Sequence, residues 1–315
     1  MGRTGTSPFG PSVCHPAHPN HAACRRPEGT SQRTRNRGIV KPTAHDVVLN
    51  NDVLIPQVGL GVFQTPDGRT TVDAVHAALE CGYRHIDTAS IYGNEKSVGE
   101  AISTSGVPRE DVFITTKLWN EDIRRHRTMD AFQESLDRLG TDYVDLYLIH
   151  WPAEGWQDAW DAMQEIYRGG RAHAIGVSNF AKNHLDELLA NTDVKPAVNQ
   201  IESSPTFPNQ DMVDYCHALG IAVEAWSPLG GTGSDLLKDE RLIEIGEKYG
   251  KSSAQVVIRW HLQRDMIVLP KSVHNTRIQQ NIHVFDFELD DEDMRRISAM
   301  DTGTRNGADP NDFDF

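Results

Sequence analysis

Short apolar runs of strand length alternate with longer amphipathic stretches along the chain from residue 45 onward. The short runs are almost continuously apolar, which predicts strands buried on both faces, as in a parallel sheet. The longer stretches have apolar residues every three or four positions, which predicts helices packed against that sheet. The expected strands cover residues 58–63, 85–89, 112–118, 144–150, 174–179, 197–201, 222–227 and 267–272.

Glycine residues stand at the ends of three predicted helices. Glycine readily takes the left-handed backbone conformation that closes a helix, so each one marks a C-terminal cap. These helical stretches are 70–82, 128–140 and 209–220. Further helices are expected over residues 235–249, from about Asn275, and over residues 290–301, which a polar tail follows.

Eight strand–helix units follow one another after a short hairpin signal, Asn50-Asn51-Asp52 between two apolar runs. We therefore expect an α/β fold, a (β/α)8 TIM barrel with an N-terminal capping β-hairpin, extra helices before and after the eighth unit, and a C-terminal tail. An open doubly wound sheet is the alternative. It is disfavoured because no G-x-G-x-x-G motif occurs, and the nearest match, residues 59–64, ends in Gln64.

Residues 1–40 differ in composition from the remainder. They are rich in Gly, Pro, Ser, Thr and His, and they lack apolar periodicity. Such a segment cannot bury enough surface to offset its ordering entropy, so we expect a disordered extension and a barrel domain over 41–315. An Arg-rich transit peptide and a translation start placed too early are alternatives. The Cys and His residues there match no standard zinc spacing, so no metal is expected.

The net charge of −14 argues against nucleic acid as a partner, because phosphate binding needs a basic surface. No apolar run is long enough to span a membrane, and no secretory signal is recognisable. The four cysteines form no dense framework, which fits a reducing compartment. We expect a cytoplasmic protein.

Polar or reactive residues end nearly every predicted strand. A single one is ordinary, and a lone histidine such as His150 is more often structural than catalytic. In a barrel, however, the carboxyl ends of the strands converge on the face that carries active sites. Seven such ends in succession therefore favour a functional constellation: Asp87, Lys117, His150, Ser178–Asn179, Gln200, Trp226–Ser227 and Lys271–Ser272.

Four of these positions suit one chemistry. A lysine inside a barrel needs a counter-charge, and Asp87 on the neighbouring strand is the natural partner of Lys117. That ammonium should lower the pKa of Tyr92 on the following loop and make it a general acid, with His150 donating to the same oxygen. No G-x-S-x-G elbow for an activated serine occurs. The set fits carbonyl reduction, in which hydride reaches carbon and a proton reaches oxygen.

A phosphate site is expected near the last strand. Lys271 and Arg277 flank Ser272 at the head of a predicted helix, where backbone N–H groups also favour anions. Trp226 could stack on a flat ring. A carboxamide could be held by Ser178, Asn179 and Gln200.

Residues 45–315 resemble the aldo-keto reductases, and within them the bacterial 2,5-diketo-D-gluconate reductase group. The matching stretches, in family order, are "GYRHIDTASIYGNE", "TKLWN", "YLIHWP", "IGVSNF", "NQIE", "WSPLG" and "LPKSVHNTRIQQN". The resemblance implies NADPH-dependent reduction of aldehydes and ketones, such as dicarbonyls and keto sugars. It also implies a catalytic tetrad in which Tyr92 donates the proton, Lys117 assists it, Asp87 pairs with Lys117, and His150 orients the carbonyl.

The same resemblance implies the ligand sites. NADPH or NADP+ would contact Ser178, Asn179, Gln200, Trp226, Ser227, Leu229, Lys271, Ser272, Val273, Arg277, Gln280 and Asn281. The substrate pocket would include Phe63, Trp119, His150 and Asn179. Two departures from the family pattern are Gln280, where relatives often have Glu, and "IESSP" (201–205), where they usually have Leu-His before the Pro.

Two other functions fit the same residues. A nucleotide-sensing barrel would bind NADPH tightly and turn over slowly, and a lyase would form a Schiff base on Lys117. The family resemblance favours a monomeric enzyme that acts on a small carbonyl compound.

Overall fold

The computed structural model describes Gly2 and residues 45–315. The predicted disordered extension, residues 1–40, lies outside the described residues apart from Gly2. The barrel is therefore described from residue 45.

Ten strands and eleven α-helices are described within residues 45–315. The strands are β1 (Asp46–Val48), β2 (Leu54–Pro56), β3 (Leu60–Gly61), β4 (His85–Asp87), β5 (Phe113–Leu118), β6 (Val144–Ile149), β7 (Ala172–Ser178), β8 (Val198–Glu202), β9 (Ala222–Trp226) and β10 (Ile267–Val268). The helices are α1 (Arg69–Glu80), α2 (Glu95–Thr104), α3 (Asn120–Arg124), α4 (Thr128–Leu139), α5 (Trp156–Arg168), α6 (Lys182–Ala190), α7 (Gln210–Ala218), α8 (Glu240–Tyr249), α9 (Ser253–Leu262), α10 (Asn275–Ile282) and α11 (Asp291–Ser298). Three 3-10 turns complete the order: η1 (Ser90–Tyr92), η2 (Arg109–Asp111) and η3 (Leu236–Lys238).

The eight strands β3 to β10 form one parallel sheet in sequence order. Isolated parallel bridges join Val58 to Val268 and Gly61 to Lys271, and the Gly59 N–H donates to the Val268 carbonyl at 2.9 Å. These contacts bring the first strand back to the last, so the sheet closes into the predicted (β/α)8 barrel. β3 and β10 are shorter than predicted, because single bridges replace a continuous ladder at this seam.

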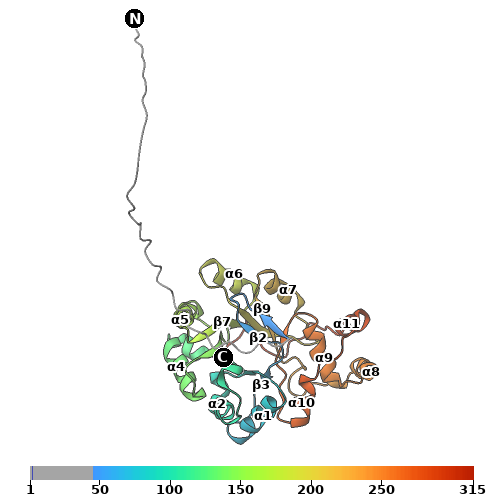
Figure 1. Ribbon diagram of the computed structural model, residues 1–315. Coiled ribbons are helices and arrows are strands. Elements are labelled where there is room, and N and C mark those ends of the chain that lie inside the picture. Colours follow the sequence, from blue (N-terminus) through green and yellow to red (C-terminus); the bar gives the residue numbers. More distant parts are fainter. Residues whose placement is uncertain (1, 3–44) are drawn as a thin grey trace, which may run out of the picture. The chain divides into compact units, whose positions relative to one another are not determined.

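The helices surround the strands, as Figure 1 shows with the strands at the centre. The largest apolar cluster lies between the barrel wall and this ring of helices. The glycines predicted to cap helices, Gly82, Gly140 and Gly220, all have positive φ. The extra helices are also confirmed, as α8 before the eighth unit and α11 after it. No described helix is both long and apolar enough to cross a membrane.

The predicted hairpin, β1 and β2, covers the amino ends of the barrel strands. Its Ile55 and Leu49 pack in one buried cluster with Phe113 of β5 and Leu146 of β6. The turn is tied to the barrel by Asn50, whose side-chain amide donates to the Pro196 carbonyl at 2.9 Å. This end of the barrel is therefore closed, and only the opposite end, where the strands finish, is left for a binding site.

Candidate active site

The carboxyl ends of three adjacent strands carry Asp87, Lys117 and His150. Asp87 and Lys117 belong to β4 and β5, and His150 directly follows β6; these three strands are neighbours in the sheet. Tyr92 lies in the 3-10 turn η1 that follows β4, and the hydroxyl of Ser90 in this turn donates to the Lys117 carbonyl at 3.0 Å. The structure thus brings together all four residues predicted as a tetrad.

The Lys117 ammonium is the centre of this group. Its side chain is 0% exposed, and Nζ donates to both carboxylate oxygens of Asp87 at 2.7 and 2.8 Å and to the Thr88 carbonyl at 2.8 Å. The Tyr92 hydroxyl lies 3.5 Å from the same Nζ. Burial alone would lower the pKa of Lys117, but Asp87 and then Tyr92 raise it above its ordinary value. The ammonium is therefore a fixed cation, unsuited to form a Schiff base.

The pKa of Tyr92 corrects one expectation. The Lys117 charge acts in the predicted direction and lowers this pKa, but burial is the larger effect, and Asp87 adds to it, so the net pKa is raised. Tyr92 consequently carries its proton at neutral pH. A protonated hydroxyl next to a buried ammonium can give up its proton when negative charge develops on a nearby oxygen.

His150 faces Tyr92 across the mouth of the barrel. Their ring centroids are 5.7 Å apart, and the Trp119 ring lies 5.1 Å from the imidazole. Burial, followed by the Lys117 charge, lowers the pKa of His150 well below its usual range. The imidazole is therefore neutral and can donate a hydrogen bond without adding charge.

A second polar group lies beside the tetrad, at the ends of β7, β8 and β9. The Asn179 amide donates to the His150 carbonyl at 3.0 Å, and its oxygen accepts from the Trp226 indole N–H at 2.8 Å. The Ser178 hydroxyl donates to the Gln200 carbonyl at 3.0 Å. The predicted carboxamide and ring-stacking residues thus form one connected group next to His150.

Backbone strain marks the same edge of the barrel. Asn179 and Ser227, which follow β7 and β9, have φ of 62° and 50°, and Gln64 has φ of 55°. Positive φ costs energy in residues other than glycine and is retained where the surrounding structure requires it. Gly230 and Gly231, in the loop after β9, also have positive φ, which suits a backbone that approaches a ligand closely.

Lys271 and Arg277 lie near the amino end of α10. Both side chains are exposed, and within residues 45–315 neither forms an ion pair with a carboxylate. The Ser272 hydroxyl between them is buried and accepts from the His274 N–H at 3.1 Å. These two cations near a helix amino end create a region of local positive charge in an acidic chain.

The other predicted cofactor residues differ in how exposed their side chains are. Gln280 is exposed on α10, whereas Asn281, the next residue of that helix, is buried. Leu229 and Val273 are half-buried and pack against the apolar core.

Aromatic side chains line the mouth of the barrel. Phe63 is 53% exposed, and its ring centroid lies 5.0 Å from that of Tyr92. The predicted wall of Phe63 and Trp119 is completed by Trp151 and by Phe313 and Phe315 of the C-terminal tail, which the sequence did not single out as individual pocket residues. Phe315 stacks on Trp119 at 6.0 Å, and the Trp151 ring contacts both Phe313 and Phe315.

The C-terminus lies near the centre of the ring of helices in Figure 1. Hydrogen bonds hold the C-terminal segment at two places. The Phe315 carbonyl accepts from Asn120 at 3.0 Å and from Arg124 at 2.8 Å. Further back, the buried Glu202 carboxylate accepts the backbone N–H groups of Asn306 and Gly307 at 2.6 and 3.0 Å. The signal in the sequence was the pair of aromatic residues in the final "FDF", inside an otherwise polar tail.

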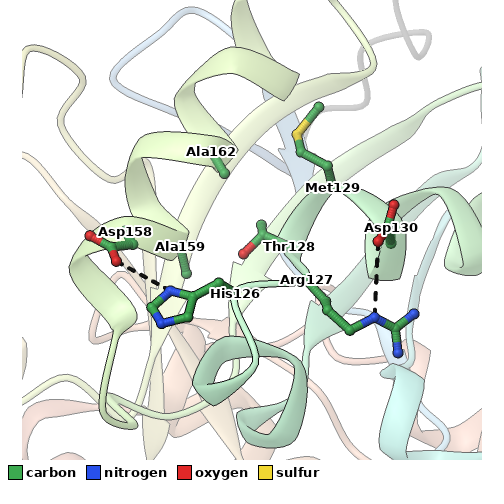
Figure 2. A pocket seen from close by; sticks show the side chains of 8 residues that line it. All are labelled: His126, Arg127, Thr128, Met129, Asp130, Asp158, Ala159 and Ala162. Carbon is green, nitrogen blue, oxygen red and sulfur yellow. Dashed lines mark ion pairs between the residues drawn. The ribbon is translucent and has the colours of Figure 1, made fainter.

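A separate small cavity of about 120 Å³ lies on the outer surface at the start of α4, against α5 (Figure 2). Its charges are paired within the cavity wall, His126 with Asp158 and Arg127 with Asp130. None of the tetrad residues lines it. The candidate site at the barrel mouth is therefore separate from this cavity.

The chain is similar to known proteins over most of its length. A family model described as "Aldo/keto reductase family" matches residues 57–302. An aldo-keto reductase of Mycolicibacterium smegmatis is 52% identical over 272 residues, which cover 85% of this chain and 98% of that protein. A glyoxal reductase of Bacillus subtilis is 48% identical over 270 residues, covering 85% and 97%. The crystal structure of MGS-M4, an aldo-keto reductase from a Medee basin deep-sea metagenome library, aligns with a TM-score of 0.83 at 45% identity, covering 85% of this chain and all of that one.

The lowered pKa of His150 predicts a specific pH response. By NMR, the His150 imidazole should remain neutral as the pH falls through about 6.5, where an ordinary histidine binds its proton, because burial and the Lys117 charge lower the pKa of His150. The unfolded chain binds this proton near pH 6.5, so the free energy of unfolding should fall as pH drops below that value. His150→Gln should remove this part of the pH dependence in denaturant titrations. Titration of His150 near pH 6.5 in the folded protein would contradict the prediction.

Proposed function

This chain belongs to the aldo/keto reductase family, and on that premise we propose that it reduces small aldehydes and ketones with NADPH, using Tyr92 as the proton donor. The observation that carries the proposal is the contact of the Lys117 ammonium with both Asp87 and the Tyr92 hydroxyl. NADPH, when bound, supplies the hydride that reaches the carbonyl carbon.

The protein residues manage the charge that develops on the carbonyl oxygen. The Tyr92 hydroxyl gives its proton to this oxygen, and Lys117 stabilises the phenolate that remains. Asp87 keeps Lys117 in place through two hydrogen bonds. The neutral His150 imidazole donates to the same oxygen and orients the carbonyl group. All four side chains come from one chain, so a monomer contains the complete site.

The barrel mouth fits a nicotinamide nucleotide. Trp226 offers a half-buried ring whose indole N–H is already bonded to Asn179, so the ring is held for stacking. The strained backbone at Asn179 and Ser227 lies beside it. Lys271 and Arg277, both without carboxylate partners in the described part of the chain, suit the 2′-phosphate that distinguishes NADPH from NADH.

Dicarbonyls and keto sugars are the proposed substrates. The similarity to a glyoxal reductase supports a small dicarbonyl, such as methylglyoxal, and 2,5-diketo-D-gluconate remains a candidate. The aromatic wall of Phe63, Trp119 and Phe315 excludes water from one side of the pocket and adds apolar contact for the carbon chain of the substrate. An assay of NADPH oxidation with methylglyoxal tests the proposal directly, and tight NADPH binding without turnover of any carbonyl compound would favour a sensing role.

Tyr92→Phe tests the proton donor. Because the hydroxyl acts in the transition state, kcat should fall about 10²- to 10⁴-fold, while the NADPH dissociation constant measured by fluorescence should stay within about twofold. Tyr147→Phe is the matched control, since the Tyr147 hydroxyl is buried and has no hydrogen-bond partner. Wild-type turnover in Tyr92→Phe would exclude this role.

Lys271→Ala tests the phosphate site. Loss of one charge-assisted contact should raise KM for NADPH about 10- to 100-fold and leave KM for NADH nearly unchanged. Lys271→Arg, which keeps the charge, should retain most of the preference. Equal weakening of both cofactors would mean that Lys271 does not contact the 2′-phosphate.

Arg124→Ala tests the C-terminal segment as a pocket wall. Losing the bond to the Phe315 carbonyl should loosen the aromatic contact with Trp119 and raise KM for the carbonyl substrate about 3- to 10-fold, with kcat within about twofold. Arg125→Ala is the control, because Arg125 is the adjacent exposed arginine and pairs with Glu121 instead. An unchanged KM in Arg124→Ala would show that the segment does not shape the pocket.

A further inference from the structure

A second carboxyl group lies inside the barrel, beneath the tetrad. Glu224 is the middle residue of β9 and is 0% exposed. Its neighbours Val223 and Ala225 face the outer apolar cluster, so strand alternation directs Glu224 into the barrel, on the same side as Trp226. An acidic residue within a buried strand is rare without a partner.

Glu224 is linked to the tetrad through one side chain. The Gln200 amide nitrogen donates to the Asp87 carboxylate at 2.9 Å and to Glu224 Oε2 at 3.0 Å. Both donor hydrogens of this amide are therefore used, one on each carboxyl group. Any shift of Glu224 moves Gln200 and is transmitted to Asp87, which holds Lys117.

The charges in this buried group do not balance if Glu224 is ionised. Lys117 is the one buried ammonium here, and its hydrogen bonds go to Asp87 and the Thr88 carbonyl, not to Glu224. Glu224 Oε1 is buried without a hydrogen-bond partner. A second anion without its own cation would be costly at this depth, whereas a neutral acid is tolerated.

The His85 imidazole lies close to Glu224 Oε1. The distance from its Nε2 is 3.7 Å, and this ring is 0% exposed and also bonded to the Thr115 hydroxyl at 3.0 Å. Burial lowers the pKa of His85 to about 4, so this imidazole is neutral and supplies no positive charge. His85 can face a protonated Glu224 but cannot neutralise an ionised one.

We propose that Glu224 is a positioning residue for carbonyl reduction, holding Asp87 in place through the Gln200 amide as a neutral acid, and that loss of its proton weakens proton donation by Tyr92. The inference rests on the proposed role of Tyr92 and deepens it.

The surroundings of Glu224 agree with this state. Burial and, second, the Asp87 charge raise the pKa of Glu224 to about 8, against the smaller opposing effects of the Gln200 hydrogen bond and Lys117. The titratable or charged groups that face it are His85 and Asp87 from β4 and Lys117 from β5. β8 contributes the amide Gln200, and β10 pairs with β9 at this position through the apolar Ile267.

Ionisation has a defined consequence. Above about pH 8 a second negative charge would lie near Asp87 and Lys117. This added negative charge would disfavour loss of a proton from the neighbouring groups, so the pKa values of Lys117 and Tyr92 would rise further. Tyr92 would then be a weaker acid, so carbonyl reduction should slow in this pH range.

The test compares pH profiles of kcat/KM for NADPH-dependent methylglyoxal reduction. We expect the wild type to fall about 5- to 10-fold across an alkaline step near pH 8. Glu224→Gln, which resembles the neutral acid in shape and charge, should lose this step and retain at least about half of the wild-type rate near pH 6.5. Glu224→Leu, which removes the acceptor for Gln200, should lower kcat about tenfold at every pH, with KM for NADPH nearly unchanged.

Glu95→Gln is the control for loss of a buried carboxyl group. Glu95 is 1% exposed, but it bonds to Arg138 and Thr116 and is not connected to Gln200. The alkaline step should persist in this variant. An identical alkaline step in Glu224→Gln and the wild type would overturn the proposal.

Infrared difference spectroscopy of the wild type provides a readout that needs neither turnover nor a stable variant. A protonated carboxylic acid in the folded protein at pH 7, which disappears as pH rises through about 8, is expected, and its absence would also overturn the proposal. Failure of the proposed function looks different, since the wild type would then reduce no carbonyl compound while the infrared signal of the acid remained.

Discussion

The buried ion pair between Lys117 and Asp87 is the constraint on which the site depends. A lone ammonium at the centre of the barrel would be strongly disfavoured, so the surrounding residues must supply acceptors for it. Asp87 and the Thr88 carbonyl do so from β4 and the residue that follows it. The Tyr92 hydroxyl lies on the remaining side of the ammonium. The cation that Asp87 holds in place therefore also acts on the Tyr92 hydroxyl.

Barrel closure determines which side chains can meet this ion pair. Asp87 and Gln200 are 113 residues apart in sequence, yet their side chains are 2.9 Å apart because β4 and β8 face each other across the interior. The hairpin of β1 and β2 seals the opposite end, so polar groups inside the barrel are accessible from the mouth alone. The result is a layered interior, with the tetrad at the mouth and Gln200, Glu224 and His85 beneath it.

The polar groups inside the barrel lower the stability of the fold. Apolar side chains of similar volume would pack there without the desolvation cost of two carboxyl groups, an ammonium and an imidazole. Several buried polar atoms, including His85 Nδ1, His150 Nδ1 and Glu224 Oε1, have no hydrogen-bond partner within the described part of the chain. Exposed aromatic rings at the mouth, Phe63 and Phe315, represent a second cost. Unfavourable features of this kind are common at sites that bind a ligand or transfer a proton.

The amino-acid sequence by itself determined the order of strands and helices, the parallel barrel and the tetrad positions, because hydrophobic periodicity and strand-end polarity are local properties. The role of Asp87 as partner of Lys117 also followed from strand adjacency. The tertiary structure alone decided the sign of the Tyr92 pKa shift, since that sign depends on whether burial outweighs the nearby ammonium. It also decided that Phe315 contacts Trp119 and that Gln200 joins Asp87 to Glu224. These contacts join residues distant in sequence, and no local pattern encodes the distance or the burial that governs their electrostatics.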